Sequence, residues 1–274
     1  MLDLSLEVRP FPGDTAVAIF SGDIYTEQAG NEVLQFHRRH SNDLTLMLNP
    51  VPDSMKGEFG TVLLGEGNRI VEFREKDPTS PSNLNNSSRY LVRLDLLERY
   101  RHRLTPVPVD KARHKDPGLF FDFGMHLFPL LQREGARFAG FVSEQEWADL
   151  GRVDDYLEVQ LRLMQRNGVR SIEAGARVDP AVRLAGPYLV EEQAQVTGTS
   201  LLDNAHVGRG WQVQGSVLER VVLLPLPATV SYTVESSSLK DCVVACGTLA
   251  GQQLRGRLIV SDGSRLVDKQ IQTG

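Results

Sequence analysis

Cysteine is almost absent from this 274-residue sequence, which contains only Cys242 and Cys246. Their spacing matches no common zinc motif, and no other cysteine is present to complete one. The sequence therefore argues against a cysteine-based zinc site. We expect both side chains to be buried, reduced thiols, as in a cytoplasmic protein.

Long apolar runs and a surplus of positive charge are also missing. No stretch approaches the ~20 apolar residues needed to span a bilayer, and the first residues lack the basic start and apolar core of a signal peptide. The 30 basic residues are outnumbered by 35 acidic ones, and no basic stripe alternates with aromatic residues. We therefore expect neither a membrane nor a nucleic acid as partner.

A short apolar run over residues 15–20 leads directly into Ser21-Gly22-Asp23. A continuous run of this length, bounded by glycine, predicts a strand buried on both faces of a parallel sheet. Asp23 would follow the carboxyl end of that strand, where open α/β sheets bind their ligands. Two interpretations stay open from this stretch alone: Asp23 holds a metal ion or a ligand hydroxyl, or it only begins a loop or caps a helix.

The pattern up to residue 168 predicts alternating strands and helices. A helix over 27–40 and a strand over 44–48 would complete a parallel βαβ unit with the first strand. The further elements expected are a hairpin over 60–73, a loop over 78–88, a strand over 89–92, a helix from Asp122 to Arg133, a strand over 137–142 and a helix over 154–166. This order predicts an α/β domain over residues 1–168.

Beyond residue 168, apolar residues recur at every sixth position, namely Ile172, Val178, Leu184, Val190, Val196 and Leu202. A period of six fits a hexapeptide-repeat parallel β-helix, in which one aliphatic side chain per face points inward. We expect about five coils over residues 169–274, with a β-sandwich of short strands as the alternative. An open end or flat face of such a β-helix would join subunits into a homo- or hetero-oligomer.

His206 is the only histidine in this second half. Some hexapeptide-repeat proteins are acyltransferases with a catalytic histidine, so His206 raises that possibility. No other feature supports an acyl-transfer site, and we expect a structural role for His206.

Five segments, taken in order, resemble the sugar-1-phosphate nucleotidyltransferase family, which includes mannose-1-phosphate guanylyltransferases and glucose-1-phosphate thymidylyl- and adenylyltransferases. The segments are Ser21-Gly22-Asp23, Phe59-Gly60-Thr61-Val62, residues 70–76, Asp122-Phe123 before Leu127-Phe128-Pro129, and Trp147-Ala148-Asp149-Leu150-Gly151 before Asp155-Tyr156-Leu157. The resemblance implies a Rossmann-like nucleotidyltransferase domain over residues 1–168, followed by a left-handed β-helix over residues 169–274. It also implies nucleotide-sugar biosynthesis, in which a nucleoside triphosphate (NTP) and a sugar 1-phosphate give a nucleotide sugar and pyrophosphate.

The resemblance assigns a metal site and a catalytic cation. Asp23 and Asp149 match the two aspartates that hold Mg²⁺ in the family, and hard oxygen ligands suit that ion. Lys76 matches the lysine that pairs with the phosphate of the sugar, a role for which a compact ammonium is suited.

The resemblance also assigns sugar contacts. Glu75 matches a carboxylate that accepts from sugar hydroxyls. Gly60 matches a glycine beside the sugar, where the missing Cβ lets the ligand approach the backbone. Asn86 matches an asparagine that contacts the sugar.

Two features depart from the family pattern. The Gly-rich loop of the form GxGTRLxPLT, which binds the triphosphate, has no counterpart in residues 1–14, and we expect a catalytic domain that is incomplete at its N-terminus. Activity would then require the missing segment. The family's Asn-Ala/Thr-Gly-Ile-Tyr segment is Asn86-Ser87-Ser88-Arg89-Tyr90 here. Both departures support an alternative function, a non-catalytic regulatory or scaffolding subunit related to the family.

Overall fold

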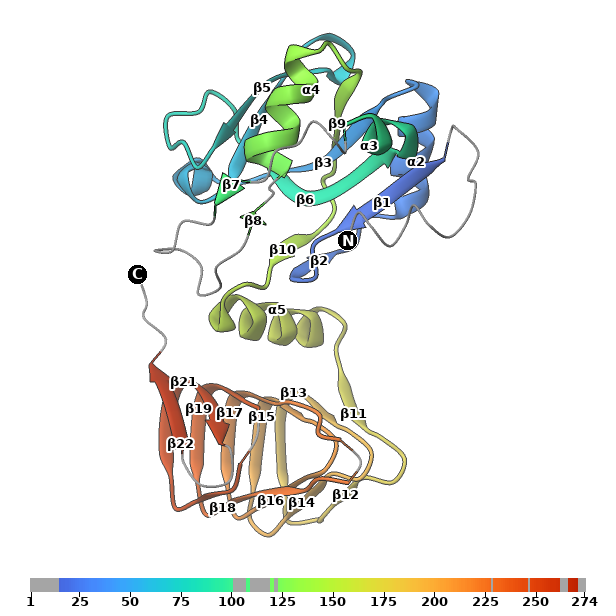
Figure 1. Cartoon of the computed structure of the whole chain (residues 1–274). Coiled ribbons are helices and arrows are strands. Elements are labelled where there is room, and N and C mark those ends of the chain that lie inside the picture. The colour runs from blue at the N-terminus through green and yellow to red at the C-terminus, as the bar shows by residue number, and fades with distance from the viewer. Residues whose placement is uncertain are drawn as a thin grey trace. The chain divides into compact units, whose positions relative to one another are not determined.

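The computed structural model describes residues 15–100, 107–108, 119–120, 123–227, 229–245, 247–261 and 266–270. The chain divides into two compact units, Met1–Ala148 and Asp149–Gly274 (Figure 1). Each unit has its own hydrophobic core. Asp122 and Cys246, to which the sequence assigned a helix cap and a buried thiol, lie outside the described residues.

The first unit is a mixed α/β structure whose elements follow the predicted order. They are β1 (Ala16–Phe20), β2 (Ile24–Thr26), α2 (Gly30–Arg39), β3 (Leu44–Pro50), η1 (Asp53–Glu58), β4 (Gly60–Leu64), η2 (Glu66–Asn68), β5 (Ile70–Glu75), β6 (Leu84–Arg93), α3 (Leu94–Tyr100), β7 (Val107–Pro108), β8 (Leu119–Phe120), η3 (Phe123–Leu127), α4 (Phe128–Arg133), β9 (Phe138–Val142) and β10 (Trp147–Asp149).

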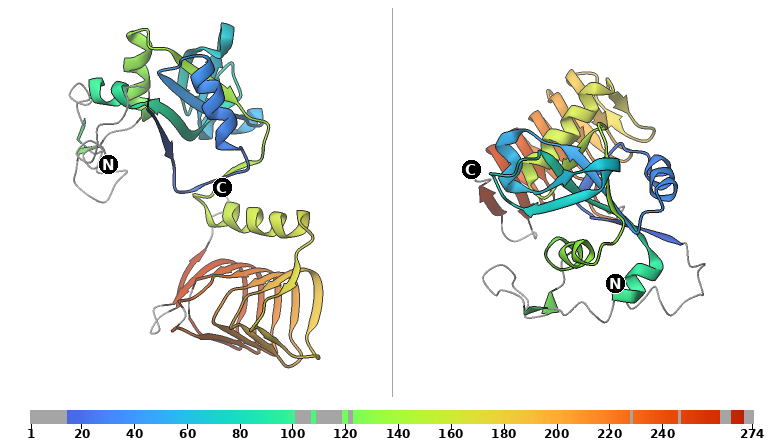
Figure 2. Two further views of the ribbon diagram at one scale, coloured as in Figure 1. Left: turned by 90° about the vertical axis from the view of Figure 1, so that its right-hand side faces the viewer. Right: turned by 90° about the horizontal axis from the view of Figure 1, so that it is seen from above.

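The main sheet has the order β5-β4-β6-β3-β9, and β1 also pairs with β6. Strand β6 runs antiparallel to β1, β3 and β4, whereas β3 and β9 are parallel. Alternate residues of β3 supply two cores, because Leu46 packs with Phe128 of α4 while Met47 packs with Val33 of α2. Helices therefore cover both faces of the sheet (Figures 1 and 2).

Strand β1 forms where the sequence predicts it, but the prediction of a parallel strand buried on both faces is wrong. It pairs antiparallel with β6, and Phe20 is 54% exposed. Strands β1 and β3 do run in the same direction, as a βαβ unit requires, but β6 lies between them. The predicted loop over 78–88 is wrong at its end, because Leu84 already pairs with Pro50 of β3.

Strands β2 and β10 form a separate two-stranded sheet. Next to it, the Glu27 amide donates a hydrogen bond of 3.0 Å to the Glu146 carbonyl.

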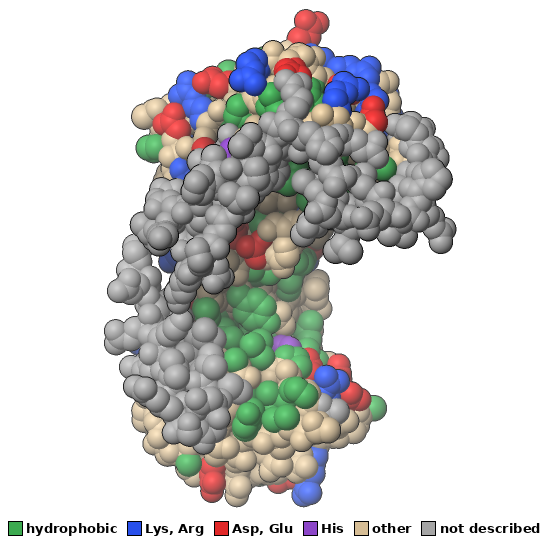
Figure 3. Space-filling model, viewed as in Figure 1, with side chains coloured by type: hydrophobic (Ala, Val, Ile, Leu, Met, Phe, Trp, Pro, Cys, Tyr) green, Lys and Arg blue, Asp and Glu red, His purple; other side chains and the backbone are tan. Residues whose placement is uncertain are grey.

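On the face of the first unit seen in Figure 3, lysine and arginine side chains alternate with aspartate and glutamate. None of the helices within the described residues has both the length and the apolar character to cross a membrane.

The second unit is one helix followed by a parallel β-solenoid of about five turns. Its elements are α5 (Val153–Arg166), β11 (Arg170–Ile172), β12 (Arg177–Val178), β13 (Arg183–Val190), β14 (Gln195–Thr197), β15 (Leu201–Val207), β16 (Trp211–Gln214), β17 (Val217–Leu223), β18 (Tyr232–Glu235), β19 (Ser238–Val244), β20 (Leu249–Ala250), β21 (Gln253–Ser261) and β22 (Leu266–Gln270). Apart from β22, which pairs antiparallel with β21, successive turns stack as parallel strands.

The period of six in the sequence is confirmed by columns of inward side chains. One column runs through Val178, Val196, Val213, Val234 and Leu249, which are paired in register from turn to turn. All except Val178, which is partly buried, are at most 1% exposed. The hexapeptide pattern therefore predicted inward side chains of the solenoid, except at Ile172, which is 43% exposed.

The long strands of the solenoid bend at residues with left-handed backbone conformation. Asn204, Arg220 and Asp241 have φ between 50° and 53°, and Gly186 and Gly256 occupy the corresponding place in β13 and β21. This conformation is unusual outside glycine. Its repetition lets each long strand supply two faces of the coil.

Helix α5 packs on the solenoid. Its Leu157, Leu161 and Met164 form one buried cluster with Val222 and Val243. The compact unit that contains the solenoid begins at Asp149 and includes α5, and the division into domains after residue 168 stays a prediction. The amphipathic pattern of α5 indicates an apolar face but not the element that the face covers.

Candidate functional site

Three predicted sugar-binding residues lie in one row across the sheet. Gly60 of β4 is directly opposite Glu75 of β5. On the other side of β4, Thr61 pairs with Asn85, so that Asn86 of β6 lies next to Gly60. Residues directly opposite in an antiparallel pair share one face. The fold thus brings Glu75, Gly60 and Asn86 together on the face of the sheet that α4 covers.

Gly60 is required because two side chains occupy the space above it. A Cβ at this position would lie 2.7 Å from Cζ of Phe73 and 2.8 Å from Oε2 of Glu75. Its backbone conformation is not left-handed, so space alone excludes larger residues. Phe73 is held by an edge-on contact with Phe128, with ring centroids 5.3 Å apart. Gly60 therefore fixes where the Glu75 carboxylate can lie.

Lys76 directly follows this row and has an unusual backbone. Its φ is 50°, in the left-handed region that non-glycine residues rarely adopt. Its amide donates a hydrogen bond of 3.1 Å to the Phe59 carbonyl, the residue before Gly60. The side chain is exposed, and no ion pair involves it within the described residues. Strained backbone of this kind concentrates at functional sites. Because the Lys76 side chain is exposed, its ammonium is available at the edge of the row.

Asn86 is held by its own strand. Its Nδ2 donates to the Tyr90 hydroxyl at 3.1 Å, and its Oδ1 accepts from the Ser88 amide at 3.3 Å. Ser88 has φ of 53°, and the pairing of β6 with β3 shifts register here. The left-handed conformation explains physically why glycine suits this position in the family pattern. Asn86 thus belongs to the row, while its contact with a sugar stays a prediction.

The residue that sequence reasoning missed is Arg89. It is 1% exposed, and among the described residues it donates only to neutral acceptors, on Ser87, Asn49 and Thr26. Burial lowers the pKa of its guanidinium to about 10. The signal available in the sequence was a charged residue directly before the apolar run Tyr90-Leu91-Val92.

The two predicted metal ligands belong to different units. Asp23 is exposed in the turn after β1 and accepts a 2.5 Å hydrogen bond from the Ser21 hydroxyl. Asp149 begins the second unit, is partly exposed, and accepts from the Gly151 amide at 2.8 Å. Neither carboxylate is ion-paired within the part of the chain that the structure describes.

Both aspartates fit a magnesium ion chemically. No group of three or more His, Cys, Asp or Glu side chains within the described residues forms a metal cage. Mg²⁺ does not need one, because it keeps several waters and is commonly held by one or two carboxylates together with substrate phosphates. Each carboxylate is therefore a suitable Mg²⁺ ligand, and the metal role of Asp23 and Asp149 stays a prediction.

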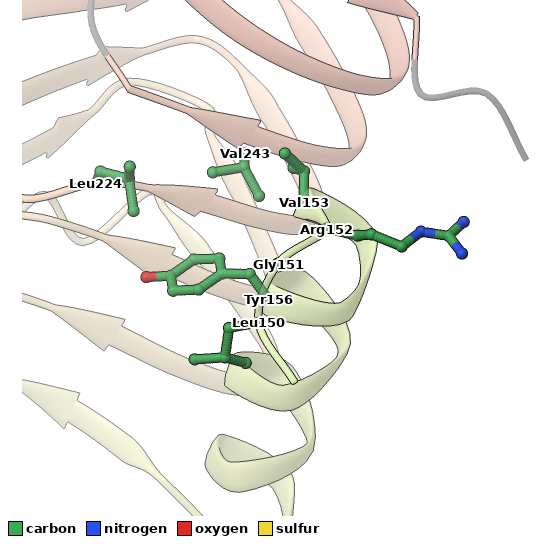
Figure 4. Close-up of a pocket in the computed structure, with 7 residues that line it drawn as sticks. All are labelled: Leu150, Gly151, Arg152, Val153, Tyr156, Leu224 and Val243. Atoms are coloured by element: carbon green, nitrogen blue, oxygen red, sulfur yellow. The ribbon is translucent and has the colours of Figure 1, made fainter. Parts of the chain in front are cut away.

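The second unit contains a pocket that the sequence did not predict. It is lined by Leu150, Gly151, Arg152, Val153, Tyr156, Leu224 and Val243 (Figure 4). Arg152 points away from it, so the lining is mainly apolar. Burial, together with the negative charge of Glu191, raises the pKa of Tyr156. None of the six predicted site residues lines this pocket.

His206 and Cys242 have structural surroundings. The His206 ring contacts Glu191 through Nε2 at 2.8 Å and the Gln160 amide through Nδ1 at 3.2 Å, so both ring nitrogens are engaged. This arrangement joins α5 to the solenoid and fits the expected structural role. The Cys242 side chain is buried in the solenoid core, as predicted.

Comparison with known proteins gives a family match over the first part of the chain. The family model described as "Nucleotidyl transferase" matches residues 6–166. The chain is similar to a glucose-1-phosphate adenylyltransferase of Desulfitobacterium hafniense, with 25% identity over 229 residues that cover 83% of this chain and 52% of the relative. It is also similar to a mannose-1-phosphate guanylyltransferase of Mycobacterium tuberculosis, with 27% identity over 219 residues that cover 76% of this chain and 56% of the relative. The chain thus spans about half the length of these curated relatives.

Proposed function

Because the chain belongs to the nucleotidyl transferase family, we propose that it binds a sugar 1-phosphate and an NTP and takes part in nucleotide-sugar biosynthesis. In this reaction a phosphate oxygen of the sugar 1-phosphate attacks the α-phosphorus of the NTP. The bond from that phosphorus to the bridging oxygen of the β-phosphate breaks, and pyrophosphate leaves. The relatives named above act on glucose 1-phosphate and mannose 1-phosphate, which suggests the substrate class.

The observation that carries the proposal is the row of Glu75, Gly60 and Asn86, with Lys76 at its end. A carboxylate and an amide can bond sugar hydroxyls, and the missing Cβ of Gly60 leaves the space in which the Glu75 carboxylate and the Phe73 ring lie. The exposed ammonium of Lys76 can pair with the phosphate of the sugar. These groups bind and orient the attacking oxygen, which is the main contribution that proteins make to phosphoryl and nucleotidyl transfer.

Asp23 and Asp149 are the residues that we propose to hold Mg²⁺, which when bound offsets the negative charge that builds on the phosphates. Lys76 supplies a further positive charge from the chain itself. Asp23 stays hydrogen-bonded to Ser21, which limits the orientations of its carboxylate.

A second candidate function is a non-catalytic subunit that retains sugar-phosphate binding. The Ser88-Arg89 pair favours it, because the family pattern has Gly-Ile at these two positions, next to the predicted sugar contact Asn86. In either case we propose that subunits associate through the solenoid, whose first turn leaves Ile172 43% exposed. We also propose a cytoplasmic location, because the sequence has only two cysteines.

The test combines binding with turnover on the full chain. Calorimetry with glucose 1-phosphate and mannose 1-phosphate should show binding that Glu75→Gln weakens about tenfold, the loss of one charged hydrogen bond. Glu72→Gln is the matched control, because Glu72 is on the same strand but its side chain points to the opposite face. Absence of binding by the unmodified chain would contradict both candidate functions.

Pyrophosphate release then separates the two candidates. With Mg²⁺, an NTP and the sugar 1-phosphate that binds, a catalytic chain should release pyrophosphate, and Lys76→Met should abolish the release. Binding without release in the unmodified chain would support the non-catalytic subunit.

A further inference from the structure

Arg89 is a buried cation without an acidic partner. Its Nη2 donates to Asn49 Oδ1 at 2.8 Å and to Ser87 Oγ at 2.9 Å, and its Nη1 donates to the Thr26 hydroxyl. Within the described residues, no carboxylate lies within the 4.0 Å of an ion pair. Burying an uncompensated charge is unfavourable, and apolar side chains of similar volume are often better for stability. Stability of the core alone therefore does not account for this residue.

The guanidinium joins three strands. Ser87 and Arg89 belong to β6, Asn49 to β3 and Thr26 to the end of β2. Asn49 is itself anchored, since its Nδ2 donates to the carbonyl oxygens of Ser143 and Gln145. Arg89 thus ties the small β2 strand to the central strands of the main sheet through a planar fork of donors.

The strand that Arg89 holds is the one that follows Asp23. Thr26 lies three residues after Asp23. On the other side of Asp23, the Ser21 amide donates to the Ser88 carbonyl at 3.1 Å. Both ends of the segment from Ser21 to Thr26 are therefore attached to two neighbouring residues of β6, Ser88 and Arg89.

We propose that Arg89 is a positioning residue for the Asp23 carboxylate. By holding β2 against β6 and β3, it sets the place of the Asp23 turn relative to Asn86, which precedes Ser88 on the same strand. The inference rests on the proposed role of Asp23 in Mg²⁺ binding, but its structural part can be tested without any metal.

The structural test is hydrogen exchange on the full chain. In Arg89→Met, the amides of Ser21 and Glu27 should exchange about tenfold faster, because the segment between them loses an anchor. Arg93→Met is the matched control: Arg93 is on the same strand but pairs with Asp43 and Asp95, away from the Asp23 turn. Unchanged exchange in Arg89→Met, or an equal increase in Arg93→Met, would overturn the proposal.

The functional readout is Mn²⁺ affinity, with Mn²⁺ as the probe for the Mg²⁺ site. We expect Arg89→Met to weaken Mn²⁺ binding about fivefold and Arg89→Lys to restore part of the loss, because a lysine keeps one of the donor contacts. Arg93→Met should leave the Mn²⁺ affinity unchanged. If the loss in Arg89→Met came only from lower stability of the fold, Arg93→Met would weaken Mn²⁺ binding as well. Equal affinity in Arg89→Met and the unmodified chain would show that Arg89 does not position a metal ligand.

Two further variants keep the outcomes separable. Thr26→Val removes the Arg89 acceptor on β2, together with the hydrogen bond from the Gln28 amide to the same hydroxyl. It should reproduce the faster exchange if Arg89→Met does not fold, and unchanged exchange in Thr26→Val would refute the anchoring. Asp23→Asn tests the proposed function itself. If it leaves Mn²⁺ affinity unchanged, the metal role of Asp23 fails, whereas the exchange data still decide whether Arg89 holds the turn.

Discussion

Replacing Gly60 by alanine tests the row of predicted sugar contacts most directly. The new methyl group would lie 2.7 Å from Phe73 Cζ and 2.8 Å from Glu75 Oε2, where ordinary contacts begin at 3.4 Å. The Phe73 ring must therefore move by about 0.7 Å and the Glu75 carboxylate by about 0.6 Å. The Phe73 ring is held against the fully buried Phe128, whereas the Glu75 side chain is exposed. We expect Glu75 to swing out of the row, at a cost of about 1–2 kcal/mol in the free energy of unfolding.

Displacing the carboxylate should reduce the affinity for the sugar 1-phosphate about tenfold, equivalent to about 1.4 kcal/mol. Calorimetric titration gives the affinity, and urea denaturation gives the free energy of unfolding. Gly65→Ala is the matched control, since its methyl group would meet Val71 Cγ1 at 2.8 Å. Val71 is 48% exposed and lies outside the row, so ligand affinity should be unchanged. Unchanged affinity in Gly60→Ala would refute the reasoning.

Three further predictions concern stability. Burial, with a smaller effect of Arg93, lowers the pKa of His37 to about 4. The folded state therefore favours the neutral imidazole, and this contribution to stability is complete above pH 6.5. Between pH 6.5 and 4, the free energy of unfolding should fall by about 3 kcal/mol. Urea titrations should show that His37→Gln lacks this loss, whereas the exposed His40→Gln retains it. Ser88→Gly should raise the free energy of unfolding by about 1 kcal/mol by removing a strained left-handed residue; a decrease would refute this. Leu161→Ala, at a site 1% exposed, should cost about 2–5 kcal/mol by the same measurement, and the exposed Gln165→Ala less than about 0.5 kcal/mol.

Much of the local structure followed from periodicity in the sequence. The hairpin of β4 and β5 formed as predicted, and five of the six apolar residues spaced by six lie in or against the solenoid core, whereas Ile172 is 43% exposed. Such patterns report on a residue's own element, because alternation and repeat length depend only on nearby chain. The same reasoning placed Asp23 just after a strand but misjudged that strand's burial and pairing.

The candidate site was predictable only residue by residue. The resemblance named Gly60, Glu75 and Asn86 separately, and the sheet order then placed them in one row. The strand that completes the row, β6, begins inside a segment rich in serine and asparagine that reads as a loop. Its pairing with β3, about 40 residues earlier in the chain, outweighs the low strand propensity of those residues.

By itself, the sequence determined the two kinds of repeat in this protein, alternating α/β elements and then hexapeptide turns, because each is a property of neighbouring residues. Tertiary structure alone decided three other features. It placed β6 between β1 and β3, assigned helix α5 to the solenoid, and buried Arg89 where it reaches Thr26 and Asn49. Each of these three features depends on which distant segments of the chain meet. A local sequence pattern shows that a face is apolar or that a donor is present, but it does not show which residues will pack against that face or accept from that donor.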